Sequence, residues 1–131
     1  MLSIDYIMTT ELLTMASSNT VGDAFELISK QKIRHIPVVD GDKLVGMVSQ
    51  RDLLLFHEHV NIPLSDIMQK ELITIEPERS IRSAALLLQK HKIGSLPVLE
   101  EGRLVGIVTD TDFVGVAINL LEQNELEDDL E

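Results

Sequence analysis

A seven-residue stretch that occurs twice constrains the fold of this chain more than any other feature. Gly46–Asp52 reads Gly-Met-Val-Ser-Gln-Arg-Asp, and Gly106–Asp112 reads Gly-Ile-Val-Thr-Asp-Thr-Asp. Both contain a glycine, two apolar residues, a hydroxyl, two further polar residues and an acid. The same shift of 60 residues aligns Pro37-Val38 with Pro97-Val98 without a gap. The sequence therefore predicts a tandem duplication in which the two halves share one fold.

The length of each half limits how it can fold. A half contains only about 60 residues, and a chain of that size buries too little surface for more than a marginal core. We therefore expect the 131 residues to form one folding unit with a shared core. We assign residues 1–60 to the first repeat, 61–121 to the second repeat and 122–131 to an acidic tail.

The charge and the residue types exclude several classes of function. The formal charge is −11, from 22 acidic and 11 basic residues, and six of the acids lie in the tail. Binding to nucleic acid or to an anionic membrane needs clustered Lys and Arg, so neither is predicted. Asp5 and Glu11 argue against a signal peptide, and no apolar run approaches the ~20 residues of a membrane span. The absence of cysteine excludes disulfides and fits a cytoplasmic protein.

Local patterns predict the elements of the first half. The expected order is a helical lead-in at 3–8, a short strand at 12–15, a helix from Thr20, strands at 36–39 and 44–48, and a helix at 52–59. Thr20 and Asp23 form an acidic variant of the capping box, which starts the longer helix. Asp40-Gly41-Asp42 is a hairpin turn between the last two strands. Each half is therefore predicted to be β-α-β-β-α, which is a mixed α+β fold.

The second half repeats these elements, with Ser80 as the cap of its longer helix. Its last helix, from Asp112 to about Leu121, is apolar nearly all round and so needs cover on more than one side. Together with Leu86 and Leu87 it carries more apolar surface than one small module should bury. We therefore predict a homodimer formed through the helices that follow the repeated stretch and the longer helices of each half. The acidic tail beyond Leu121 is expected to fray.

This order of elements resembles the CBS-domain pair, or Bateman module, over roughly Ile4 to Leu121. The resemblance rests on Asp5-Tyr6-Ile7-Met8, on the hairpin Ile36–Gly46 and on Ser49-x-x-Asp52, all of which recur in the second half. It implies two pseudo-symmetric clefts between the repeats and a disc-shaped dimer. In the family these clefts hold adenosine-containing ligands: AMP, ADP, ATP, S-adenosylmethionine or a cyclic dinucleotide. The chain resembles the stand-alone bacterial or archaeal members.

The hydroxyl and the acid of the repeated stretch suit a nucleotide. Ser49 and Thr109 stand where a strand meets a helix N-terminus, whose free N–H groups and positive dipole end favour phosphate. Asp52 and Asp112 offer carboxylates that accept hydrogen bonds, as a ribose diol requires. The alternative interpretation is structural, because Ser/Thr-x-x-Asp is also a helix N-cap followed by an acid.

The residues before the two repeated prolines, Pro37 and Pro97, differ between the repeats. Arg34 and His35 precede the first proline, and the resemblance implies that these positions approach ligand phosphates; Gly94 and Ser95 precede the second. The predicted nucleotide-binding residues are Ser49, Asp52, Thr109, Asp112, Gly46, Gly106, Thr14, Met15, Arg34, His35, Ile36, Pro37, Thr74, Ile75, Leu96 and Pro97. The glycines allow close backbone approach, and the apolar residues could sandwich adenine.

The extra acid Asp110 beside Thr109 should repel phosphate unless a cation such as Mg²⁺ intervenes. If each cleft draws its charge mainly from its own repeat, the cleft at Asp52 prefers phosphorylated ligands. If the pseudo-twofold axis instead brings Arg34 into the cleft at Asp112, that cleft prefers phosphorylated ligands.

The sequence contains no nucleophile–base–orienter set, so catalysis is not predicted. His57 and His59 point to different faces of a helix, so a metal site is not predicted either. We expect a non-catalytic regulatory module that binds adenine nucleotides without an obligatory cofactor and signals to a partner protein. A ligand-free dimerisation module is the alternative, and a nucleotide hydrolase ranks third.

Overall fold

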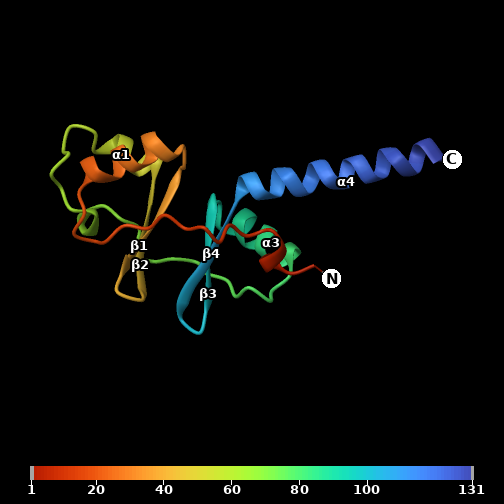
Figure 1. The fold of residues 1–131 in the computed structure, drawn as a ribbon, viewed down its shortest axis with the longest axis horizontal. Helices are drawn as coiled ribbons and strands as arrows, with labels where there is room; N and C mark the ends of the chain where they lie inside the picture. Colours follow the sequence, from red (N-terminus) through yellow and green to blue (C-terminus); the bar gives the residue numbers. More distant parts are fainter. Residues whose placement is uncertain (1, 131) are drawn as a thin grey trace.

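The computed structural model describes residues 2–130, with side chains as far as Glu125 in the last helix. Two similar halves lie side by side, and one long helix extends from the second half (Figure 1). The elements are η1 (Ile4–Tyr6), α1 (Val21–Gln31), β1 (His35–Asp40), β2 (Lys43–Ser49), α2 (Gln50–Leu55), η2 (Leu64–Asp66), α3 (Ile81–His91), β3 (Ser95–Glu100), β4 (Arg103–Thr109) and α4 (Asp110–Leu130). The predicted α+β fold is confirmed.

The longer helices begin at the predicted caps. Thr20 Oγ1 accepts the Asp23 N–H at 3.2 Å, and Asp23 Oδ2 accepts the Thr20 N–H at 2.9 Å. The hydrogen bond from the Thr20 N–H is the main reason why the pKa of Asp23 lies below its usual value. In the second half, Ser80 Oγ accepts the Ser83 N–H at 3.0 Å. These bonds satisfy N–H groups that a helix start otherwise leaves free.

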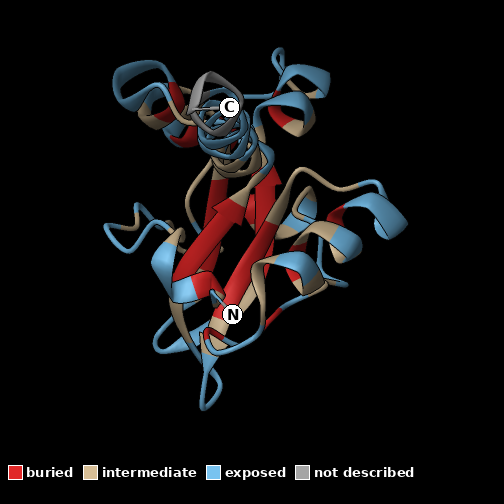
Figure 2. Cartoon of the chain, turned by 90° about the vertical axis from the view of Figure 1, so that its right-hand side faces the viewer, coloured by how far each residue is buried: buried red, intermediate tan, exposed pale blue. Residues whose placement is uncertain are grey.

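Each half contains its own antiparallel hairpin, β1–β2 and β3–β4. Both hairpins have a bulge at the same place, between Val38 and Val39 and between Val98 and Leu99. Their central residues are the most buried part of the molecule (Figure 2). The predicted strand at 12–15 is reduced to a single parallel bridge between Met15 and Val38.

The core consists of two clusters rather than the single shared core that was expected. Each cluster lies between one hairpin and the helices of its half, but it also contains a residue from the other repeat. Ile4, at 0% exposure, belongs to the cluster of the second half, and Leu64, also at 0%, belongs to that of the first. The two lead-in segments are therefore exchanged between the halves.

Backbone hydrogen bonds hold the exchanged segments in place. In the second half, the Ile4 N–H donates to the Arg79 carbonyl at 2.9 Å. In the first half, the Leu64 N–H donates to the Asn19 carbonyl at 2.7 Å. Because each lead-in closes the other repeat, the halves cannot separate without breaking both clusters.

Two helices differ from the prediction. α2 covers Gln50–Leu55 instead of 52–59, because the chain turns at Phe56, which packs on the first cluster. α4 starts at Asp110 and continues to Leu130, so the expectation of a frayed tail is wrong for the residues that the structure describes. The sequence after Asp112 contains no proline to stop a helix, and Asp110 and Asp112 suit its positive N-terminus. Glu131, the end of the predicted tail, lies outside the described residues.

Candidate functional site

The main candidate site is a cleft of about 400 Å³ between the two repeats, named here the Asp52 cleft. One wall is formed by the end of β2 and the start of α2. The other is formed by the segment before α3, the turn after α3 and the start of β3. A two-way backbone bridge between Met47 and Gln69, with N–O distances of 3.0 and 2.9 Å, joins the walls. The lining residues are His35, Met47, Ser49, Arg51, Asp52, Gln69, Glu71, Leu72, Ile73, Lys92, Ile93, Gly94, Ser95 and Pro97.

Ser49 and Asp52 hold each other in place at the start of α2. Ser49 Oγ accepts the Asp52 N–H at 3.1 Å, and Asp52 Oδ2 accepts the Ser49 N–H at 3.1 Å. The capping interpretation of this pair is therefore confirmed. Both side chains are half-buried and also line the cleft. The Ser49 hydroxyl can still donate its proton, and the Asp52 carboxylate has further lone pairs for donors on a ligand.

The chemistry of the Asp52 cleft combines apolar and charged groups. Leu72, Ile93 and Pro97 offer an apolar surface for a planar base. Arg51 and Lys92 supply cations from opposite repeats, and Glu71 adds an acid. A cavity with apolar walls and a few convergent polar groups is typical of a small-molecule site. Since both walls contribute charge, the premise that a cleft draws its charge mainly from its own repeat does not hold.

A second cavity lies at the pseudo-symmetric position but measures only about 80 Å³. We call it the small cavity; Thr9, Glu11, Leu12, Leu13, Ile33, His35, Pro37 and Ile107 line it. From the second repeated stretch only Ile107 contributes to this wall. Thr109 and Asp112 stand at the start of α4, where Asp112 Oδ2 accepts the Thr109 N–H at 2.8 Å and the hydroxyl at 3.4 Å.

His35 lines both cavities. Its imidazole packs on Gly94, where an added Cβ would lie 3.3 Å from His35 Nε2 and 3.6 Å from Asp110 Oδ2. Burial lowers the pKa of His35, and Arg34 adds to this effect, whereas Asp110 and Asp52 act in the opposite direction. Asp110 therefore stands beside Gly94, which lines the Asp52 cleft, whereas Asp110 itself does not line it.

The other predicted site residues have different positions. Ile36 and Leu96 are fully buried, Ile75 is 5% exposed, and Met15 packs on the first cluster, so these four belong to the core. Thr14 and Thr74 are exposed, and Thr14 lines a separate hollow beside the hairpin turn of β1–β2. Of the predicted set, the structure brings together Ser49, Asp52, His35 and Pro97 in the Asp52 cleft, and His35 with Pro37 in the small cavity.

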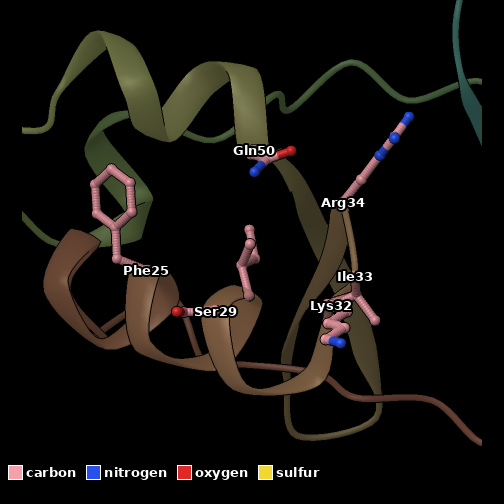
Figure 3. A pocket seen from close by; sticks show the side chains of 7 residues that line it. Phe25, Ser29, Lys32, Ile33, Arg34 and Gln50 are labelled. Atoms are coloured by element: carbon pink, nitrogen blue, oxygen red, sulfur yellow. The ribbon is translucent and has the colours of Figure 1, made fainter.

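Arg34 contributes to neither cleft wall. It lines a hollow of about 520 Å³ between α1 and the start of α2, where its side chain points away from Phe25 (Figure 3). This hollow is larger than the Asp52 cleft, but its walls come from one repeat and include neither Ser49 nor Asp52. It is therefore the weaker candidate for a nucleotide site.

The glycines of the repeated stretch have a packing role. A Cβ on Gly46 would lie 2.5 Å from Met68 Sδ, and one on Gly106 would lie 2.6 Å from Met8 Sδ. The methionines come from the exchanged lead-in segments. The close approach predicted for these glycines is therefore made by methionine side chains.

The residues that line the Asp52 cleft and were missed by sequence reasoning include Met47, Arg51, Gln69, Glu71, Leu72, Lys92 and Ile93. The repetition itself contained part of the signal, because Glu11-Leu12 recurs as Glu71-Leu72 and Lys32 as Lys92. Among the side chains that the structure describes, which extend to Glu125, no group of three His, Asp or Glu residues is arranged to hold a metal ion. In the same range, no helix combines the length and apolar character needed to cross a membrane.

Two curated relatives resemble the chain over most of its length. The CBS domain-containing protein YhcV of Bacillus subtilis strain 168 is 33% identical over 112 residues, which cover 82% of this chain and 80% of YhcV. The inosine-5'-monophosphate dehydrogenase of Korarchaeum cryptofilum is 37% identical over 103 residues, which cover 78% of this chain. The matched part is only 21% of that dehydrogenase.

Solved structures resemble the fold closely. The structure described as an acetoin utilization protein (AcuB) from Vibrio cholerae is 43% identical. Its TM-score is 0.89, over 95% of this chain and 98% of that one. The CBS domain pair of MJ0100, in complex with 5'-methylthioadenosine and S-adenosyl-L-methionine, is 26% identical, with a TM-score of 0.84 over 90% and 97% of the chains. CBSX2 in complex with AMP is 29% identical, with a TM-score of 0.82 over 92% and 98%.

The CBS domain family matches two stretches of the chain, residues 4–58 and 64–119. These stretches follow the duplication seen in the sequence and include both hairpins and both repeated motifs. The chain therefore belongs to the CBS-domain family and contains a pair of CBS domains.

Proposed function

We propose that the protein is a non-catalytic regulatory module that binds an adenosine-containing nucleotide in the Asp52 cleft. The observation that carries this proposal is the convergence of Ser49, Asp52, Arg51 and Lys92 on an apolar cavity of about 400 Å³. That volume lies within the range of roughly 300–1,000 Å³ that is usual for small-molecule sites. The adenosine ligands of MJ0100 and CBSX2 support the choice of ligand class.

Each group has a role in this proposal. Leu72, Ile93 and Pro97 contact the adenine, and the Asp52 carboxylate accepts hydrogen bonds from the ribose hydroxyls. The Ser49 hydroxyl, with Arg51 and Lys92, binds phosphate or another anionic group of the ligand. Occupancy of the cleft then changes how the two repeats lie against each other, and a partner protein reads that change. The partner and the cytoplasmic location stay predictions.

Titration calorimetry with AMP, ADP, ATP and S-adenosylmethionine, with and without Mg²⁺, tests the proposal. Asp52→Ala should weaken the best ligand by about 1.5–3 kcal/mol, the range for a hydrogen bond to a charged group. Asp112→Ala is the matched control, because it removes the equivalent carboxylate outside the cleft. If no ligand in the panel binds, or if both variants lose affinity equally, the site assignment is wrong.

We also propose that two copies associate through α4. Val114, Ile118 and Leu121 are 59%, 49% and 61% exposed. Their spacing of four and three residues places them on one face of the helix, and α4 extends away from the rest of the chain (Figure 1). Burial of that face against the same face of a second copy would remove its apolar area from water.

Light scattering at micromolar concentration tests the dimer. Ile118→Glu should shift the mass from dimer to monomer, because an unpaired charge in an apolar contact is costly. Asn119→Glu adds the same charge on a different face of α4 and should leave the dimer intact. A monomeric wild-type protein would exclude this interface.

A further inference from the structure

We infer that His35 closes the second cleft, so that the protein binds one adenosine ligand per chain, at Asp52, although its sequence is duplicated. This inference rests on the proposed function, because it names which of the two equivalent clefts admits the ligand. It starts from the difference between the two cavities, about 400 Å³ against about 80 Å³. The smaller volume is about that of two or three water molecules, at ~30 Å³ each.

The walls of the two cavities differ strongly in side-chain size at one position. All eight lining residues of the small cavity have a counterpart, 60 positions away, in the wall of the Asp52 cleft. Four counterparts are identical: Glu11 and Glu71, Leu12 and Leu72, Ile33 and Ile93, and Pro37 and Pro97. Leu13 with Ile73 and Ile107 with Met47 are similar in size, and Thr9 is smaller than Gln69. Only His35, in place of Ser95, is a much larger side chain.

The position of His35 explains how one side chain has so large an effect. His35 and Ser95 are equivalent first residues of β1 and β3, paired across their hairpins with Ser49 and Thr109 respectively. Ser95 leaves the Asp52 cleft continuous from Pro97 to Ser49 and Asp52. The wall of the small cavity includes Pro37 and His35 but not Thr109 or Asp112. The imidazole therefore stands as a partition between the apolar end of the second cleft and its hydroxyl and acid.

Contacts on the far side keep the imidazole in this position. Gly94 has no side chain, which lets His35 Nε2 come within 3.3 Å of its Cβ position. The charged groups around the ring are Asp110 at the start of α4, Asp52 on α2 and its neighbour Arg34. The counterpart of Gly94 in the second cleft is Arg34, which lines the hollow beside α1 instead.

Stoichiometry of AMP binding, measured by titration calorimetry on the full chain, tests the inference. The wild-type protein should bind one AMP per chain, and Asp52→Ala should weaken that binding roughly 10- to 150-fold. His35→Ser should raise the number of sites to two, and Asp112→Ala should weaken the added site by a similar factor. The double exchange His35→Ser with Ser95→His should bind one AMP, now sensitive to Asp112→Ala and insensitive to Asp52→Ala. Arg34 is also larger than its counterpart Gly94, so Arg34→Gly is the control. This variant should still bind one AMP per chain.

Ser95→His alone covers the case in which His35→Ser fails to fold. It should remove AMP binding while circular dichroism and thermal unfolding stay close to wild type, since histidine already occupies the equivalent position in the first repeat. A folded His35→Ser protein with one site, a wild-type protein with two sites, a second site created by Arg34→Gly, or unchanged binding in Ser95→His would overturn the inference. A wild-type protein that binds no AMP also overturns the inference. The proposed function fails only if ADP, ATP and S-adenosylmethionine do not bind either.

Discussion

Because the lead-in segments are exchanged, a mutation in the lead-in of one repeat should destabilise the other repeat. Ile4 lies at the start of the chain, yet its side chain is fully buried in the cluster of the second repeat. Ile4→Ala should therefore destabilise the second repeat. Truncation of a buried isoleucine to alanine costs about 2–5 kcal/mol. We use the lower limit of this range, about 2 kcal/mol, for the expected loss.

Hydrogen exchange measured by mass spectrometry gives the local readout. A loss of about 2 kcal/mol corresponds to roughly 30-fold faster exchange of amides that open with the cluster. The affected amides should include that of Ile81, which donates to the Leu2 carbonyl, and that of Ile4, which donates to Arg79. Urea unfolding, followed by circular dichroism, gives the global loss of stability.

Leu64→Ala is the matched variant, because Leu64 is the equivalent residue of the other lead-in and belongs to the first cluster. Its effect should appear first at Val21, whose N–H donates to the Ile62 carbonyl. If Ile4→Ala speeds exchange mainly in the first repeat, or if it costs less than about 0.5 kcal/mol, as a surface substitution does, the exchange of lead-ins is refuted.

Three further predictions concern the repeated motif and His35. Ser49→Ala should cost about 1 kcal/mol of stability in ligand-free protein, because Ser49 Oγ accepts the Asp52 N–H. Thr109→Ala should cost less, because the Thr109 hydroxyl makes a long contact of 3.4 Å with the Asp112 carboxylate. Equal losses in urea unfolding would contradict this difference. Gly46→Ala should cost about 1–3 kcal/mol through overpacking against Met68, and the cost should shrink in a Met68→Ala background, as a double-mutant cycle can measure. Because burial lowers the pKa of His35, the unfolded chain takes up a proton more readily than the folded one. Stability should therefore fall as pH drops below the ordinary histidine value of 6.5, and His35→Gln should reduce that dependence in unfolding curves at pH 7.5, 6.5 and 5.5.

The parts of the fold that depend on neighbouring residues could be predicted from the sequence. Thr20 with Asp23, and Asp40-Gly41-Asp42 between two apolar runs, determine a helix start and a hairpin through local contacts. The extent of α4 was underestimated, because a run of acids near a helix C-terminus is unfavourable for the dipole, yet the helix continues to Leu130. The prediction of a single shared core was wrong, because nothing in the sequence around Ile4 or Leu64 indicates which cluster each residue joins.

Only one wall of the candidate site could be predicted from the sequence. Ser49 and Asp52 belong to a motif, and the motif places them at the start of α2. The opposite wall comes from the other repeat, so Glu71 and Lys92 reach the cleft only through the pseudo-twofold arrangement of the halves. For the same reason, sequence comparison of His35 with Ser95 showed a difference in charge, whereas the structure shows a difference in the space left between the walls.

The exchanged lead-ins also impose an order on folding during synthesis. The first cluster has all its residues once Met68 has left the ribosome, so it can close early. Ile4 and Met8 are made first but pack against residues as late as Val108, so they wait for the second hairpin. At about 5–20 residues per second, that delay is roughly 5–20 s. During this time the apolar side chains of Ile4 and Met8 have no cluster to join, so they are open to contact with a chaperone or a neighbouring nascent chain.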